Sequence, residues 1–196
     1  MIVPVTPLRY FLSLILFLAC MSAQAQDGIR QGYFLIATPK QDNTPFAHTV
    51  IYLTQAGDDG SYGLIVNRPT GITMEEVIPE AASTRHAKDE LFIGGPMHGR
   101  FLFLLTRSGP AEGMHQVSPD VFFAAGRDTI IRLAEEQPNT VMRMYAGFTS
   151  WGPGQLEQEI TSGYWVIAPA KTQQVFGDQP GQLWRTLYSL WKGSWI

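Results

Sequence analysis

Short apolar stretches separated by turn residues dominate the pattern of hydrophobic and polar positions along the chain. They are rich in β-branched and aromatic side chains and are bounded by glycine, proline, asparagine or aspartate, which is typical of β-strands. The strands predicted on this basis cover residues 32–38, 48–54, 62–66, 91–93, 101–105, 140–146 and 164–168, with 113–117 as a further candidate. The second and third are separated by Gly57-Asp58-Asp59-Gly60, and so short a connection predicts an antiparallel hairpin. The apolar run at 121–125 is ambiguous, because its periodicity does not separate a strand from a helix.

Helical periodicity occurs in fewer places. The spacing of Thr73 and Glu76 predicts a capping box and therefore a short helix. A longer helix is expected over residues 129–137, with Asp128 as its N-cap. The polar stretch 80–89 fits either a loop or a frayed helix. Near the C-terminus one apolar stripe repeats at helical spacing, formed by Leu183, Trp184, Leu187, Tyr188 and Trp191.

The order of these elements indicates the fold class. Strands are joined by turns, a few helices are interspersed, and no regular strand-helix-strand alternation occurs, so we predict an α+β fold with a mixed, largely antiparallel sheet. A doubly wound parallel sheet fits the pattern less well. A chain of 196 residues with 45% hydrophobic content can build one sizeable core but not two comfortable domains. We therefore expect a single compact domain.

The first 25 residues have the three parts of a secretory signal peptide. A positive charge precedes an almost wholly apolar run from Phe11 to Met21, and small residues follow up to Ala25. The run is shorter than the roughly 20 residues that a membrane span needs. We therefore expect cleavage after Ala25, a domain over residues 26–196 and a periplasmic location. The alternatives are a lipid anchor at Cys20, in a degenerate lipoprotein box, and a translation start at Met21, which would leave the protein cytoplasmic.

Charge and composition bound the chemistry of the domain. With 14 basic and 17 acidic residues, the net charge of −3 offers no broad positive field, so we expect no nucleic-acid partner. Cys20 is the only cysteine and lies in the signal-like segment, so residues 26–196 contain no thiolate nucleophile and no disulfide. The four histidines lack the spacing of a metal site, and no phosphate loop, dinucleotide fingerprint or nucleophile elbow is present. We expect neither a metal nor a cofactor.

The densest mix of glycine, tryptophan and carboxylate lies between Tyr145 and Pro169. The turn residues that follow Trp151 cannot continue a strand, so a helix is expected to begin there. On that helix Gln155 and Glu159 share one side, whereas Glu157 is rotated by ~200° from Glu159. This separation disfavours an acid–base pair, although the two acids would share a face if the segment were a strand.

Two other segments complete the predicted binding surface. An arginine at a strand end, between asparagine and proline, can bind a carboxylate or phosphate through its fork, or pair internally with an acid such as Glu157. A glycine-glycine-proline segment can present backbone amides to an anion or form a tight turn. Trp151, in a glycine-rich loop, is the tryptophan expected to line a cleft. The candidate binding surface comprises Asn67, Arg68, Pro69, Gly94, Gly95, Pro96, Trp151, Gln155, Glu157 and Glu159.

Several of these motifs together resemble the AlgH/YqgE family of small bacterial proteins. They are GYFLIATP (32–39), TVIYL (49–53), GLIVNRP (63–69), GGP (94–96) and WGPGQLEQEI (151–160), in order along the chain. The resemblance implies a compact α+β domain with a partly barrel-like sheet flanked by helices. It implies no established enzymatic activity or cofactor. The family carries a transcriptional-regulator label without a recognisable DNA-binding element.

The chain departs from the family pattern in two ways. The signal-like segment conflicts with a regulator role, because an exported protein cannot sit on a promoter. Residues 148–150, Phe-Thr-Ser, stand where relatives have a shorter glycine-tryptophan segment. We therefore expect a non-enzymatic module that binds another protein or a small ligand. The alternatives are an acid–base or hydrolase-like enzyme that uses Glu157 or Glu159 with Arg68, and a cytoplasmic regulator that acts through protein contacts.

N-terminal sequencing of the protein purified from its host tests the expected signal peptide. Cleavage after Ala25 gives Gln26 as the first residue. A terminus blocked by lipid at Cys20 would support the lipoprotein alternative. A terminus at Met21, or at Ser22 after methionine removal, would contradict export.

Overall fold

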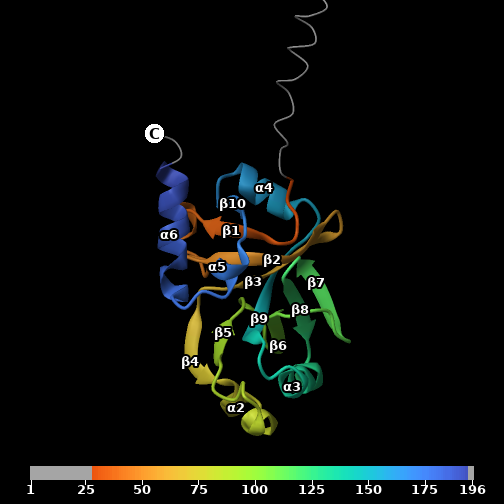
Figure 1. Cartoon of the computed structure of the whole chain (residues 1–196). Helices are drawn as coiled ribbons and strands as arrows, with labels where there is room; N and C mark the ends of the chain where they lie inside the picture. The colour runs from red at the N-terminus through yellow and green to blue at the C-terminus, as the bar shows by residue number, and fades with distance from the viewer. Residues whose placement is uncertain (1–27, 194–196) are drawn as a thin grey trace, which may run out of the picture.

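The computed structural model describes residues 28–193, and in this range the chain forms one α+β domain built on a strongly curled sheet (Figure 1). The strands are β1 (Tyr33–Ala37), β2 (Val50–Gly57), β3 (Gly60–Ile65), β4 (Pro69–Thr73), β5 (Glu90–Ile93), β6 (Met97–Arg107), β7 (Met114–Ser118), β8 (Val121–Ala125), β9 (Val141–Trp151) and β10 (Trp165–Pro169). The helices are α2 (Met74–Val77), α3 (Arg127–Glu136), α4 (Gln155–Thr161), α5 (Thr172–Val175) and α6 (Pro180–Gly193). No helix in the described part of the chain is long and apolar enough to span a bilayer.

The strands follow the order β10-β1-β2-β3-β9-β6-β8-β7, and neighbours along this path are antiparallel. β5 adds a parallel pairing to β9, and β4 pairs with β5. The predicted class is confirmed: the sheet is mixed, largely antiparallel and curled into a half-barrel, and it is flanked by helices (Figure 1). Val175 of α5 and Leu187 of α6 pack into the inner cluster.

β7, the last strand of this order, approaches β2 and the residues before β1 through side chains. The Tyr52 hydroxyl on β2 donates to Ser118 Oγ on β7 at 3.1 Å, and the Gln31 amide donates to the Gln116 carbonyl at 3.3 Å. Burial raises the pKa of Tyr52 to about 12, so its hydroxyl stays protonated and able to donate. These contacts bring β7 next to the start of β1.

β9 carries the bend that allows the sheet to curl. Its first half lies between β5 and β6, and its last three residues pair with β3 instead. Gly147, with φ +73°, lies between the two halves. A Cβ at Gly147 would meet the Gly95 carbonyl at 2.6 Å and the Met97 carbonyl at 2.7 Å, so only glycine fits. The sequence prediction ended this strand at residue 146, whereas β9 continues through Gly147 to Trp151.

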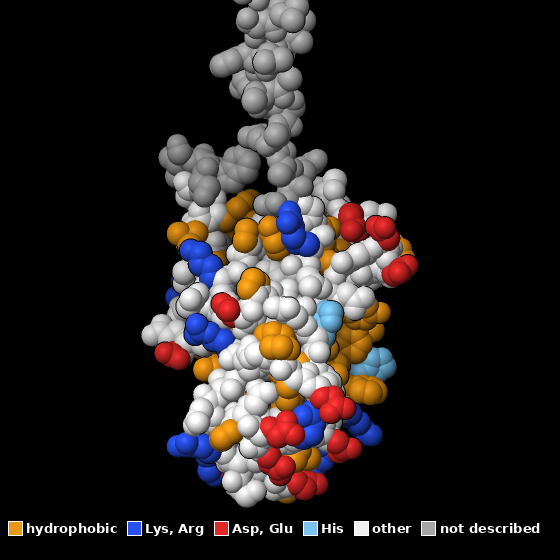
Figure 2. Space-filling view, turned by 45° about the vertical axis from the view of Figure 1, so that its right-hand side comes forward, with side chains coloured by type: hydrophobic (Ala, Val, Ile, Leu, Met, Phe, Trp, Pro, Cys, Tyr) orange, Lys and Arg blue, Asp and Glu red, His pale blue; other side chains and the backbone are white. Residues whose placement is uncertain are grey.

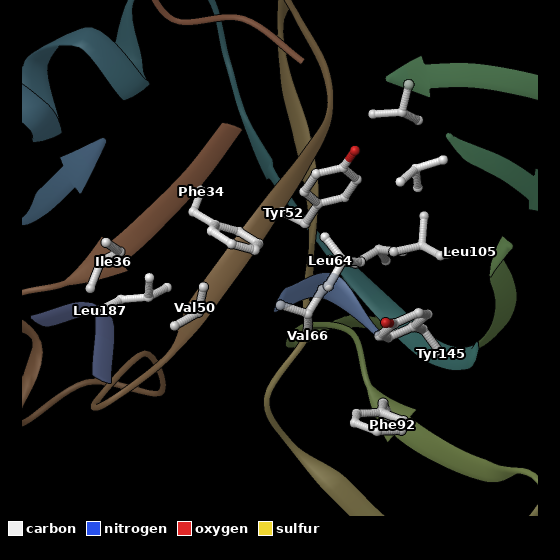
Figure 3. Close-up of a cluster of buried hydrophobic side chains, with 13 residues drawn as sticks. Phe34, Ile36, Val50, Tyr52, Leu64, Val66, Phe92, Leu105, Tyr145 and Leu187 are labelled. Atoms are coloured by element: carbon white, nitrogen blue, oxygen red, sulfur yellow. The ribbon is translucent and has the colours of Figure 1, made fainter. Parts of the chain in front are cut away.

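Apolar side chains form a core inside the half-barrel and two clusters outside it. The inner cluster includes Phe34, Tyr52, Leu64, Leu105 and Tyr145, which converge from β1, β2, β3, β6 and β9 (Figure 3). A second cluster packs α2 and α3 against β6, β8 and β9, and a third packs α4 against β1, β2 and β3. Along β1, Phe34 and Ile36 belong to the inner cluster and Leu35 and Ala37 to the third cluster, so alternate side chains bury both faces of this strand.

Most predicted elements are confirmed. β2 and β3 form the hairpin, and Thr73 and Glu76 form the capping box of α2. Residues 121–125 form a strand, and the C-terminal stripe packs α6, whose Trp184 indole donates to the Ala37 carbonyl at 2.8 Å.

Two predictions are corrected. Asp128 is not the N-cap of α3; Gly126 holds that position with φ +93° and Asp128 lies in the first turn. Residues 69–73, expected to follow the end of a strand, form β4 themselves, because Pro69 opens a strand that pairs with β5. The segment 80–89, for which a loop and a frayed helix were both open, begins in a 3-10 helix (Pro79–Ser83) and continues in turns.

His86 is buried, and this burial was not anticipated from the sequence. Its Nδ1 lies 2.7 Å from Asp89 Oδ2 and its Nε2 lies 3.1 Å from the Gln137 carbonyl. Both partners are acceptors, so only the imidazolium can donate to both. The hydrogen bond to Asp89 is the main cause that raises the pKa of His86, assisted by the Gln137 carbonyl and opposed by burial.

We expect Gly95→Ala to destabilise the protein by about 3 kcal/mol, because its Cβ would collide with the backbone of Phe148 and Thr149 rather than with a flexible side chain. Gly99→Ala is the matched control. A Cβ there meets nothing within 4 Å, so the change should stay within about 0.5 kcal/mol. Urea unfolding of both variants measures the difference. Equal unfolding free energies for the two variants would contradict the close backbone approach.

The His86 contacts also predict a pH dependence of stability. Because the folded-state pKa is raised, the stabilisation is complete below the ordinary histidine pKa of about 6.5 and is lost as the pH rises through the higher folded value. The difference in unfolding free energy between wild type and His86→Gln should therefore shrink as the pH rises above 6.5. A difference that stays constant or grows over this range would contradict the arrangement.

Candidate functional site

The turn after β9 positions the carboxylate of Glu159. Gly154, with φ +73°, precedes α4, and the Gly152 amide donates to Gln155 Oε1 at 3.1 Å. The predicted helix start is confirmed. Gln155 and Glu159 share one side of α4, because Gln155 Nε2 donates to Glu159 Oε1 at 3.0 Å, while Glu157 is exposed. The two acids thus do not meet.

Two tryptophan side chains converge on the same carboxylate. The indole N–H of Trp151, at the end of β9, donates to Glu159 Oε2 at 2.9 Å, and the indole N–H of Trp165, at the start of β10, donates to the same oxygen at 2.7 Å. Their rings meet edge to face with centroids 6.1 Å apart. Glu159 therefore joins α4 to two strands through charge-assisted hydrogen bonds.

A hollow of about 370 Å³ opens beside this carboxylate. We call it the Glu159 hollow; it is lined by Gln41, Thr44, Pro45, Phe46, Glu159 and Tyr164. Phe46 packs edge to face on Trp165 at 5.5 Å. One wall therefore comes from the loop between β1 and β2, and the other from α4 and the residue before β10.

Asn67 and Arg68 attach to the other end of that loop. The Asn67 side chain accepts from the Val50 amide at 2.8 Å and donates to the His48 carbonyl at 2.9 Å. Arg68 donates to the Ala47 carbonyl at 3.0 Å, and burial lowers its pKa. Among the described residues Arg68 forms no ion pair with Glu157 or Glu159.

The Gly94-Gly95-Pro96 segment lies against the bend of β9. The Gly94 amide donates to the Ala146 carbonyl at 2.8 Å, and its carbonyl accepts from the Ile65 amide at 2.7 Å. A Cβ on either glycine would collide with the backbone of Gly147 or Phe148. The Gly94 amide is therefore engaged in the sheet and both glycines lie against the bend, so the candidate surface divides into a part near Phe148 and a part around Glu159.

A second hollow, of about 320 Å³, opens at the mouth of the half-barrel. We call it the aromatic hollow; it is lined by Thr54, Gln55, Tyr62, Gly63, Leu64, Phe103, His115, Phe123 and Phe148. Most of these residues continue the inward-facing alternation of the core. Tyr62 lies two residues before Leu64, Phe103 two before Leu105, and His115 two before Val117.

The rings of the aromatic hollow pack on one another. Phe103 contacts Phe123 and Phe148, each with centroids 5.6 Å apart, and Tyr62 contacts Phe148 at 6.0 Å. The His98 ring stacks on Phe148 at 5.8 Å from a backbone with φ +49°. Figure 2 shows hydrophobic side chains gathered beside two histidines on the right-hand side of that view.

The sequence marks the aromatic hollow only weakly. Phe101 and Phe103 alternate in the segment 101–105, and Tyr62 and Phe123 lie in the segments 62–66 and 121–125, but the same pattern marks an ordinary core. Only the curl of the sheet leaves these rings at an opening. In the described range, no group of three or more histidines or acids is placed to hold a metal ion.

Comparison with known proteins places this arrangement in a family. A family model described as AlgH-like matches residues 34–195. A UPF0301 protein of Methylococcus capsulatus is 34% identical over 157 residues, which cover 78% of this chain and 86% of that protein. A UPF0301 protein of Rhizobium meliloti is 34% identical over 162 residues, covering 77% of this chain and 81% of that protein.

Solved structures show the same architecture. The solution structure of the AlgH protein from Pseudomonas aeruginosa superposes with a TM-score of 0.69 at 26% identity, covering 85% of this chain and 90% of that one. A crystal structure of a Corynebacterium diphtheriae protein gives a TM-score of 0.70 at 24% identity, covering 86% and 90%, and supports the fold alone. On the family match and the sequence relatives together, this chain belongs to the AlgH-like family.

Proposed function

We propose that this protein is a non-enzymatic binding module that holds a neutral, largely apolar small molecule in the aromatic hollow. The observation that carries the proposal is the lining of the hollow. It combines four aromatic rings, from Tyr62, Phe103, Phe123 and Phe148, with no Asp, Glu, Lys or Arg among the described residues that line it.

The lining selects for the chemistry of the occupant. Moving an ionised group from water into surroundings without a counter-charge is costly, so a charged ligand gains little here. Ring faces and edges favour a flat, apolar molecule, because offset and edge-to-face ring pairs each contribute about 0.5–1.5 kcal/mol. Gln55, Tyr62 and His115 supply polar atoms that can fix its orientation.

The position and size of the hollow support the same role. Mouths of β-barrels are among the preferred places for small-molecule sites, and such sites usually span ~300–1,000 Å³. At about 320 Å³ the aromatic hollow fits a ligand of two or three rings. Its wall is preformed, since Gly94 and Gly95 lock the backbone under Phe148.

The acid–base alternative has less support. It requires Arg68 beside Glu157 or Glu159, whereas Arg68 donates to the Ala47 carbonyl and Glu159 accepts two indole N–H groups. Glu157 lies exposed on another side of α4. The aromatic hollow provides no support for a regulator that acts through protein contacts. Export to the periplasm, proposed from the signal-like segment, is compatible with a carrier or sensor of small molecules.

The neutral fluorescent probe N-phenyl-1-naphthylamine tests the proposal. We expect a saturable rise in its fluorescence with the wild-type protein. Tyr62→Ala should weaken binding about five- to tenfold, because it removes one ring of the wall and that ring's contact with Phe148. Tyr62 is 43% exposed, so its truncation leaves the core intact.

Tyr164→Ala is the matched control for this experiment. Tyr164 has a similar exposure, 39%, but lines the Glu159 hollow. Its truncation should leave the affinity for the probe unchanged. Absence of saturable binding to the wild type, or equal affinities of the wild type and Tyr62→Ala, would overturn the proposal.

A further inference from the structure

We infer that the Glu159 hollow is a second ligand site, which takes an organic cation: an alkylammonium or guanidinium group. The inference is independent of the aromatic hollow, which lies on the inner face of the curled sheet and shares no lining residue with it. It rests on a negative charge, two aromatic rings and a preformed wall.

The charge at this site is not neutralised within the described structure. Glu159 accepts from Trp151, Trp165 and Gln155, all of which are neutral donors. Among the residues described, no lysine, arginine or histidine nitrogen lies within ion-pair distance of its carboxylate. Three neutral donors fix the position of the carboxylate and leave its full charge at the wall of a hollow, which attracts a cation.

The rings of the hollow add the second element of cation recognition. Phe46 and Tyr164 line it together with Glu159. An ammonium or guanidinium group within about 6 Å of a ring centroid is attracted by the negative face of the ring. The site already shows this preference at its edge, since Lys40 Nζ lies 5.8 Å from the centre of the Tyr164 ring.

Lys40 does not occupy the place of the ligand. Its ammonium donates to the Ser162 carbonyl at 2.6 Å, which holds it at the end of α4. It makes no ion pair with Glu159 in the described structure. An external cation can therefore reach the carboxylate without displacing an existing salt bridge.

The opposite wall is ordered before any ligand arrives. Thr44 Oγ1 donates to Gln41, whose carbonyl and side-chain oxygens lie 2.8 Å away, and it accepts from the Phe46 amide at 3.1 Å. Phe46 is then fixed by its edge-to-face contact with Trp165. A site whose walls are fixed in advance loses less conformational entropy on binding. The site therefore joins an aromatic wall to an anchored carboxylate across one small hollow.

Nuclear magnetic resonance provides a direct readout, because the indole N–H groups of Trp151 and Trp165 donate to the very carboxylate that would bind the cation. Titration with n-butylammonium chloride should shift both indole resonances saturably. Sodium chloride at equal ionic strength is the control and should shift neither. Equal responses to the two salts would overturn the inference.

Charge-matched variants locate the effect. Glu159→Gln should weaken butylammonium binding at least tenfold, whereas Glu157→Gln, which removes the same charge from the same helix, should bind like the wild type. Equal affinities of the two variants would overturn the inference.

If loss of the indole contacts unfolds Glu159→Gln, Phe46→Leu tests whether the hollow binds the cation. It keeps the carboxylate and an apolar wall but removes a ring face, and we expect several-fold weaker binding, while unchanged affinity would contradict the site.

The same titration distinguishes two sources of the cation. A free small amine and a basic side chain of a polypeptide present the same group. A short acetylated peptide with one central lysine should bind at least tenfold more tightly than butylammonium if the partner is a polypeptide. Equal or weaker binding of the peptide assigns the site to a free amine. Failure of both cations would overturn this inference while leaving the aromatic hollow and its probe experiment unaffected.

Discussion

The contact of two backbone segments without side chains between them governs this fold. Gly94 and Gly95 lie against Gly147 and Phe148 so closely that no Cβ fits on the three glycines. This approach lets β9 bend at Gly147 and change partners, from β5 and β6 in its first half to β3 at its end. A straight β9 would extend a flat sheet, whereas the bent strand curls it.

Both hollows follow from the course of β9 after this bend. Directly beyond Gly147, Phe148 turns its ring into the mouth of the half-barrel, where it meets Tyr62 and Phe103. Three residues later, Trp151 lies on the outer face and donates to Glu159. One strand thus supplies an apolar group to the inner face and a polar donor to the outer face, as the alternation of a strand allows. The aromatic hollow and the Glu159 hollow are in this sense two faces of the same segment.

Local patterns were sufficient to predict much of the architecture. Capping chemistry identified α2, turn residues identified the β2–β3 hairpin, and helical spacing separated Glu157 from Glu159. These features depend on neighbours in sequence. The pairing of β5 in parallel with β9, about fifty residues apart, and the burial of His86 against Gln137 depend on tertiary contacts that no local pattern encodes. Gly147 illustrates this limit of local patterns. The strand was expected to end before Gly147, but β9 continues through it.

The candidate site was predicted only in part for the same reason. Glu159, Gln155 and Trp151 lie together because they are close in sequence, and the prediction that Gln155 and Glu159 share a side of the helix is confirmed. Asn67 and Arg68 donate hydrogen bonds to the loop between β1 and β2, whose other end lines the Glu159 hollow. No pattern in the sequence marked that loop as part of a site. The aromatic rings were visible as core residues, but their opening to solvent depends on the curl.

The seam between β7 and the start of β1 and β2 has a mechanical consequence. It is fastened by the Tyr52–Ser118 and Gln31–Gln116 contacts instead of a backbone ladder. Val117 of β7 also packs into the inner cluster beside Tyr52. The half-barrel is therefore closed on this side by side chains rather than by backbone hydrogen bonds, and separating β7 from β2 would expose a buried valine as well as break two hydrogen bonds.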